Sequence, residues 1–382
     1  MQRSVSIVSA LVLGLGASRA ANARPMDPAL SRLVVDPGCA SSPAPACLPD
    51  RAAYHKLISQ WGFALAPQPL HAARTTGLAG FNVALLAALT GIDDTADYWR
   101  RGTEGEGELA AQAMPGNPDP SAYLQLYSLE IRKGFGFGIE AAASVGVMPD
   151  TSLVAWGAEL RVAVLEGMRR GVWRFLPDTS LGVALRQATG LGELALGTLA
   201  LDARFSKPLV SPSGFVLTPW LGYQWLGIAA DSTQVDLTPG IDPLASCGFA
   251  GSNVPAGSPD ALAGDALAGD SSAADSSAGD SSAVAASPFD GSPLCRTGNA
   301  ADFANSVSFG EADVQRQRVL LGVSYRQELL ELGAELITDL LRPDAAQPDG
   351  AVRRALRCDA AGANCRPTPR QWSLVLQVGT VF

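Results

Sequence analysis

The sequence predicts an all-β protein, an antiparallel barrel of about ten strands that crosses a membrane, preceded by a short, partly helical segment. Three observations predict this fold. From residue 76 to the C-terminus, segment after segment alternates apolar with polar side chains. The three long connections between these segments all fall on the same side of the predicted barrel. No run of roughly 20 consecutive apolar residues offers a transmembrane helix.

The N-terminus has the features of a signal peptide. A positive charge precedes the apolar stretch 5–17, which is too short to span a bilayer, and residues 21–23 read Ala-Asn-Ala, a small-x-small cleavage pattern. An uncleaved membrane anchor would need a longer apolar run. We therefore expect residues 1–23 to be removed and the mature chain to begin at Arg24.

Residues 24–72 are expected to form a periplasmic segment and a candidate plug. The stretch is Pro-rich and contains one predicted helix, Arg51–Leu65, with Asp50 as its N-cap and Pro67 just beyond its end.

The clearest strand covers residues 153–165, where a row with Trp156 and Leu160 alternates with a row carrying Glu159 and Arg161. Successive side chains of a strand point to opposite faces, so in a membrane barrel the charged row points inward and the apolar row outward. A soluble β-sandwich, the structural alternative, would also alternate. The same pattern predicts ten strands, with eight or twelve as alternatives, at 76–90, 122–132, 135–148, 153–165, 172–188, 194–206, 215–229, 315–326, 330–341 and 370–382.

Loop lengths provide an independent test of this barrel domain, residues 73–382. If the first strand runs outward, the three long segments 91–121, 230–314 and 342–369 all fall outside. The inner connections are short, as in bacterial barrels. The loop 230–314 carries an acidic pentad repeat that begins at Asp260 and is too poor in large apolar residues to build a core.

Six cysteines form three local couples, and local pairing avoids joining the two sides of a membrane. Disulfides in an exported protein are the expected outcome, and metal binding is the rival, although CxxC and HxxxH spacings are missing. The expected disulfides join Cys39 to Cys47, Cys247 to Cys295, and Cys358 to Cys365.

Charged residues on the inward rows are candidates to line the barrel interior. Acids and arginines are nearly balanced, which predicts a network of salt bridges; a weakly selective polar conduit is the functional alternative. Barrels of about eight strands are filled by side chains and open channels need about 16, so we expect a plugged interior. The candidates are Glu130, Arg132, Glu140, Glu159, Arg161, Arg186, Asp202, Arg204, Arg316, Arg318, Glu331, Glu335 and Asp339.

Catalysis and nucleic-acid binding are not expected. His55 and His71 are the two histidines and both precede the first strand, so we expect no histidine base in the barrel, no enzyme activity, no cofactor and no metal. The net charge is -9 and no Lys/Arg cluster occurs, which argues against a phosphate-binding surface.

The final strand alternates apolar residues up to a terminal aromatic: Trp372, Leu374, Leu376, Val378 and Phe382 share one face. This resembles the C-terminal signature of Gram-negative outer-membrane barrel proteins. The resemblance covers these residues closely and the strand pattern more loosely. It implies an outer-membrane location, contact with outer-membrane lipid, and recognition by the barrel-assembly machinery.

Two functions remain open at this point. The first is a porin-like protein with a narrow or gated passage for small or apolar solutes, which we favour slightly by analogy with such barrels. The alternative is a barrel that anchors disulfide-tied surface loops for a scaffold, adhesion or binding role. The sequence leaves the solute, the ligand and the oligomeric state open.

Overall fold

The computed structural model describes residues 23–36, 39, 47–68, 70–105, 116–167, 175–212, 214–239, 247–249, 293–295, 306–340 and 368–382. The chain divides into two compact units. The second unit consists of Val34–Pro49 and Gln234–Val307, and the first holds the remainder of the chain. The signal-peptide residues 1–22, the pentad repeat and the couple Cys358 and Cys365 lie outside the described residues.

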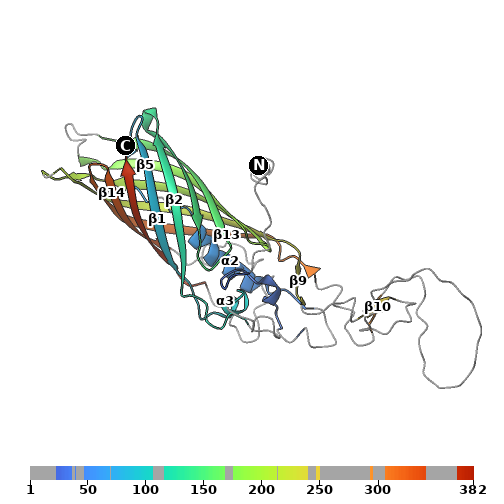
Figure 1. Ribbon diagram of the computed structural model, residues 1–382. Coiled ribbons are helices and arrows are strands. Elements are labelled where there is room, and N and C mark those ends of the chain that lie inside the picture. Colours follow the sequence, from blue (N-terminus) through green and yellow to red (C-terminus); the bar gives the residue numbers. More distant parts are fainter. Residues whose placement is uncertain are drawn as a thin grey trace, which may run out of the picture. The chain divides into compact units, whose positions relative to one another are not determined.

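Ten antiparallel strands close into a barrel in the first unit (Figure 1). Strands that follow one another pair around the ring, and the pairings of β15 with β1 and of β13 with β8 complete it. The prediction of a ten-stranded antiparallel barrel is therefore confirmed. The ring strands are β1 (Phe81–Gly91), β2 (Tyr123–Gly134), β3 (Ile139–Val147), β4 (Val154–Leu165), β5 (Asp178–Thr189), β6 (Leu194–Ser206), β8 (Val216–Ser232), β13 (Ala312–Gln327), β14 (Leu330–Asp339) and β15 (Trp372–Val381). A two-residue strand, β7 (Leu209–Val210), extends the sheet beside β8.

Several strands begin later than the sequence predicts, and backbone geometry explains two of these differences. β1 begins at Phe81 because Gly77 and Ala79 have φ of 84° and 65° and form a turn. β3 begins at Ile139 because Phe137 has φ 61° in the short η4 turn (Gly136–Gly138). Positive φ is incompatible with a strand, and alternating hydrophobicity does not reveal it.

The barrel wall has an apolar outer face and an inner face that carries its buried charged residues. Along β2, exposed and buried residues alternate, so that Ile131 is 43% exposed and its neighbour Arg132 is 3% exposed. Leu160 and Leu376, on opposite strands, are likewise about half exposed, at 49% and 51%. A water-soluble protein buries such residues, whereas a membrane barrel presents them to lipid.

The barrel has two distinct ends. The turn end bears the connections 135–138, 166–177, 207–215 and 328–329, together with Phe382, whose amide donates to Phe81 O at 2.8 Å. The loop end bears the connections 92–122, 148–153, 190–193, 233–311 and 340–371. Aromatic pairs flank the apolar wall at both ends, with Tyr123 and Trp372 at the loop end and Phe81 and Phe382 at the turn end. Such rings suit the two membrane interfaces.

One helix lies in the space that the ring of strands encloses, and we call this space the lumen (Figure 1). It is α2 (Arg51–Leu65), and the Asp50 side chain accepts a hydrogen bond from Ala53 N, so the predicted helix and its N-cap are confirmed. Buried residues occur on every side of α2. A helix surrounded by protein needs no polar face, which explains its weak amphipathicity.

The first unit also contains α3 (Asp97–Arg101) in the β1–β2 connection and the 3₁₀ turn η1 (Leu30–Arg32). Trp99 of α3 is fully buried and stacks on Trp61 of α2, with ring centroids 6.1 Å apart. The loop end of the lumen is thus packed with aromatic side chains.

The second unit contains the disulfide Cys39–Cys47, which confirms one predicted couple. Two small antiparallel pairs also lie there, β9 (Val235–Asp236) with β12 (Ser306–Val307) and β10 (Cys247–Phe249) with β11 (Pro293–Cys295). Cys247 and Cys295 are direct Cα partners in the second pair, which is the register that a cross-strand disulfide needs.

Candidate functional site: the occupied lumen

The lumen is filled by residues 51–68 and 70–76, which we call the plug. The contacts of the plug run in one direction along the barrel. Ser59 meets Arg316 near the loop-end start of β13, and Ala73 meets Ser206 at the turn-end limit of β6. The chain therefore passes lengthwise through the barrel before it enters β1.

Arg318 of β13 holds the C-terminal part of the helix. Its guanidinium donates to Pro67 O at 2.9 Å and to Phe63 O at 3.4 Å, and its carbon lies 5.0 Å from the centroid of the Phe63 ring. Gln224 of β8 accepts from the same guanidinium, with a distance of 2.9 Å to Nε. The last carbonyls of a helix carry partial negative charge, so a buried arginine is a suitable partner for them.

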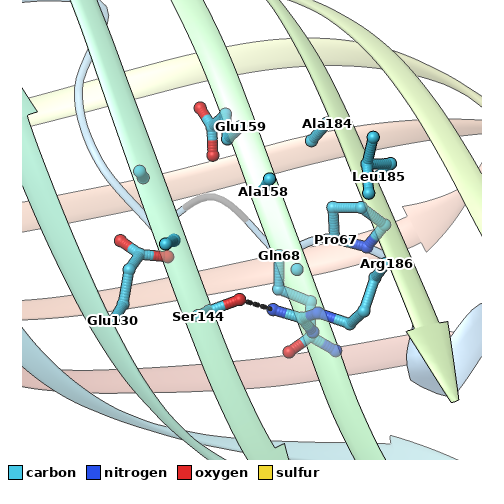
Figure 2. A pocket seen from close by; sticks show the side chains of 12 residues that line it. Pro67, Gln68, Glu130, Ser144, Ala158, Glu159, Ala184, Leu185 and Arg186 are labelled. Carbon is cyan, nitrogen blue, oxygen red and sulfur yellow. Dashed lines mark hydrogen bonds between the residues drawn. The ribbon is translucent and has the colours of Figure 1, made fainter. Parts of the chain in front are cut away.

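Arg186 of β5 reaches the same helix end from another part of the wall. Its Nη1 donates to Leu65 O and Ala66 O at 3.4 and 3.3 Å. Figure 2 shows its bond to the wall, in which Nη2 donates to Ser144 Oγ at 3.4 Å. Two arginines from well-separated strands thus replace the water that would otherwise solvate this helix terminus.

Arg316 links the plug to the wall and to the segment before β15. It donates to Ser59 O at 2.8 Å and to Asp339 Oδ2 at 2.9 Å, and it also bonds the Gln371 side chain. Gln371 N donates to the same Asp339 oxygen at 2.9 Å. Each charge in this cluster has an opposite charge or a dipole beside it, as burial requires.

Residues 71–76 of the plug are bound by a second group of charged side chains of the wall. Arg204 Nη1 donates to His71 O at 2.7 Å, and Arg161 Nη1 donates to Ala72 O at 2.7 Å. Thr76 N donates to Glu140 Oε2 at 2.7 Å, and Glu140 also pairs with Arg161. Backbone carbonyls of the plug therefore meet arginines, and a backbone amide meets a carboxylate.

Ion pairs connect the wall residues to each other. Arg132 pairs with Glu130 at 2.9 Å and Arg204 pairs with Asp202 at 3.0 Å, each within one strand at i and i+2. Glu335 lies 3.5 Å from Arg204. The lumen charges form the expected salt bridges, but much of their hydrogen bonding goes to the backbone of the plug.

All thirteen lumen candidates lie on the inner face of the ring. Eleven of them are fully buried. Glu159 and Glu331 are half-buried, and Glu331 accepts from Asn82 Nδ2 at 2.7 Å. The sequence did not single out Gln60, Gln224 or Trp220, whose Nε1 donates to Glu335 at 2.6 Å. A glutamine in the apolar C-terminal half of the helix was the signal available for Gln60.

The expectation that no histidine lies within the barrel is wrong for His71. Although it precedes β1, the plug carries it into the lumen, where it is 2% exposed. Its Nε2 lies 2.9 Å from Glu159 Oε1 and its Nδ1 lies 3.1 Å from Ala72 O. A residue that precedes the first strand can still lie inside the barrel, because here the chain passes through the lumen before it forms β1.

At the loop end, polar contacts fasten the plug and the residues before it. Gln60 Oε1 accepts from Trp99 Nε1 at 2.8 Å and from Asp93 N at 3.0 Å. Leu30 N donates to Glu193 Oε2 at 2.9 Å. Burial raises the pKa of the Glu193 carboxyl above its usual value, and the Leu30 hydrogen bond opposes this shift only in part.

The N-terminal segment lies at the same end of the barrel as the long connections. Met26 N donates to Asp150 O at 2.9 Å, and Arg32 pairs with Glu104 at 2.8 Å. The sequence predicted that residues 24–72 are periplasmic and also that the connection 91–121, which contains Glu104, faces outside. These two predictions are incompatible, because both groups share one end.

The space beside Pro67 and Gln68 of the plug is small. These residues and Glu130, Ser144 and Arg186 of the wall line a cavity (Figure 2). Its volume is about 10 Å³. One water molecule needs roughly this volume. This part of the lumen therefore offers no path for a solute.

A larger polar hollow lies at the turn end. It has a volume of about 450 Å³ and is lined by Arg74, Thr75 and Thr76 of the plug and by wall residues that include Arg132 and Glu331. The buried His71 also lines this hollow, which is a vestibule at the turn end of the plug, below the helix.

The described residues contain neither a metal-ligand cluster nor a membrane-spanning helix. No group of three or more His, Cys, Asp or Glu side chains there is arranged to hold a metal ion. Within the same residues, no helix has the length and apolar character to cross a membrane.

The candidate assembly signal is fully displayed on the outer face. Trp372, Leu374, Leu376 and Val378 are 37% to 51% exposed, and Phe382 is 67% exposed. Its ring centroid lies 6.4 Å from that of Phe81, so the last residue packs beside the first strand where the ring closes.

No protein-family model and no curated protein sequence matches this chain. Among solved structures, Ail, the attachment invasion locus protein of Yersinia pestis, in complex with the heparin analogue sucrose octasulfate, is 7% identical with a TM-score of 0.25. That match covers 80% of this chain and 99% of Ail. The translocator domain of autotransporter NalP from Neisseria meningitidis is 10% identical with a TM-score of 0.27, covering 80% and 88%. At TM-scores this low, strand pairing and not superposition establishes the barrel.

Proposed function

We propose that this protein is an outer-membrane barrel, sealed by its own N-terminal segment, that anchors a binding or scaffold surface formed by its loop end. The apolar outer face, the signal-peptide features and the terminal aromatic strand support a membrane location reached by export. The long connections then face the exterior. Lipid and, during biogenesis, the barrel-assembly machinery are the proposed partners.

One observation carries this proposal: buried arginines from several strands bind the plug backbone. Arg186, Arg316 and Arg318 bond five plug carbonyls among them, and each arginine is at most 5% exposed. Pulling the plug out would break these hydrogen bonds to buried guanidinium groups in a confined space, which is costly. A stable seal favours an anchor over an open pore.

The proposal includes no catalytic role. His71 is the natural general-base candidate in the lumen, but it is 2% exposed and both ring nitrogens contact protein groups. These contacts with Ala72 and Glu159 occupy both nitrogens and leave neither free to take a proton from a substrate.

Single-channel recording of the full chain in planar bilayers tests the seal. We expect no steady conductance from the intact protein or from Arg326→Ala, which removes an exposed arginine of the same strand as Arg318. The double variant Arg186→Ala/Arg318→Ala should show intermittent openings. Heat-modifiable migration must first establish that each barrel is folded. A steady conductance from the intact protein would exclude the sealed anchor.

A gated passage is the second candidate, and the vestibule of about 450 Å³ below a non-covalently held plug favours it. In that case a small solute would enter from the turn end once the plug moves. Liposome swelling with the full chain and with a chain lacking residues 24–72 separates the two functions. Swelling with the full chain supports gating, whereas swelling limited to the truncated chain supports a permanent seal.

A further inference from the structure

The residues just after the expected cleavage site form specific hydrogen bonds with the loop end of the barrel. Arg24 N donates to Asp27 Oδ2 at 2.9 Å, and the Arg24 guanidinium donates to Thr151 O at 3.0 Å. The other Asp27 oxygen accepts from Ser152 N at 2.7 Å and from Ser152 Oγ at 3.0 Å. Residue 24 is thus tied to the β3–β4 connection through Asp27.

Among the described residues, the Asp27 carboxylate has no ion-pair partner. It is 7% exposed. Its partners are backbone amides and a hydroxyl. A buried carboxylate normally has a cation beside it, because desolvation of an unpaired charge is costly.

Cleavage before Arg24 would supply that cation. Hydrolysis by a signal peptidase adds one water across the Ala23–Arg24 peptide bond, leaving a carboxylate on Ala23 and an α-ammonium group on Arg24. The nitrogen that gains the charge is the atom already 2.9 Å from Asp27. A neutral hydrogen bond would become a charge-assisted one.

The position of Arg24 and Asp27 also indicates on which side of the membrane the N-terminal segment lies. The plug crosses the lumen from the loop end to the turn end, so residues 24–33 lie on the side opposite the start of β1. In bacterial barrels the short turns are periplasmic and the long loops extracellular. In the orientation of the proposed function, residues 24–33 therefore lie at the outer surface.

We propose that removal of residues 1–23 creates an α-ammonium group on Arg24 that the Asp27 carboxylate binds at the loop end, which places the mature N-terminus at the outer surface. This rests on the orientation in the proposed function. The ion pair then fixes the N-terminal segment to the β3–β4 connection at Thr151 and Ser152.

Three measurements test the proposal. Mass spectrometry of the protein purified from membranes should give Arg24 as the first residue. Hydrogen exchange of residues 24–33 should then be compared in Asp27→Asn, which is isosteric but uncharged, and in Asp119→Asn, an exposed aspartate of the same end. We expect protection to fall about tenfold in the first variant and to stay unchanged in the second.

An extended chain with Gly-Ser inserted between Ala23 and Arg24, cleaved before the insertion, provides the decisive control, because Arg24 N then remains a neutral amide. Asp27→Asn should cost the extended chain much less protection than the native one. Equal losses in the two chains, or a mature chain that starts elsewhere, would overturn the ion pair.

Topology is read from epitopes on intact cells. An epitope carried by the N-terminal extension should be accessible, and one at the exposed Gly214 of the turn end should not. A third epitope in loop 230–314 separates the two proposals. If the loop is accessible and the N-terminus is not, this inference fails alone. If neither is accessible, the proposed surface anchor fails with it.

Discussion

Replacing Arg318 with methionine should loosen the plug while leaving the barrel wall intact. The guanidinium is fully buried, and its loss leaves Phe63 O, Pro67 O and Gln224 Oε1 without this donor. Each unsatisfied buried acceptor costs about 1–3 kcal/mol. Methionine fills similar volume and needs no desolvation of a charge, which offsets part of the loss. We estimate a net destabilisation of the plug of about 2–4 kcal/mol.

Hydrogen exchange measured by mass spectrometry reports this opening directly. A change of about 2–4 kcal/mol corresponds to a loss of protection in α2 of roughly 30-fold to 700-fold, because about 1.4 kcal/mol is tenfold. The matched control is Arg326→Met, at the exposed end of the same strand and on the same side of it. Protection of α2 in Arg318→Met equal to that in Arg326→Met would refute the view that wall arginines hold the plug.

Three further predictions concern the plug, its outer docking and assembly. Gly62→Ala should destabilise the plug, although alanine usually favours helices, because a Cβ would lie 2.3 Å from Ile228 Cγ2; Ile228→Ala should restore α2 protection if this clash is the cause. The raised pKa of Glu193 means that its contribution to docking is present at low pH and lost as pH rises through that pKa; residues 24–33 should be better protected near pH 4.5 than at pH 7 after correction for intrinsic exchange, and Glu193→Gln should remove the difference. Phe382→Ala should slow insertion in a membrane-assembly assay, whereas Val381→Ala, which alters a buried neighbour, should mainly lower heat stability.

The strand pattern was readable from the sequence because a barrel in lipid imposes one rule on every strand. Outward residues must be apolar, whereas inward residues can be polar or charged, so the strands of the ring alternate an exposed apolar row with a buried row that carries the polar residues. The span of β6 agrees at both ends with the prediction, 194–206. Misplaced starts such as that of β3 arose where a single backbone angle, at Phe137, interrupts the strand without changing the hydrophobic pattern.

The role of the lumen charges was only partly readable. Balanced acids and arginines predicted salt bridges, and Arg132 with Glu130 shows the simplest kind. The sequence could not show that Arg318 and Arg204 would bind backbone carbonyls of a distant segment, because a carbonyl has no sequence identity. Contacts of this type exist only once the plug is threaded.

The sequence by itself determined that the chain forms an antiparallel barrel with an apolar exterior, a charged interior and one N-terminal helix, because these features follow from local periodicity and capping. Only the tertiary structure decided where that helix lies and which way the N-terminal segment runs. A segment before the first strand can remain below the ring or pass through it, and both paths have the same local sequence. The choice depends on long-range complementarity between plug backbone and wall arginines, which brings His71 inside and Arg24 to the loop end.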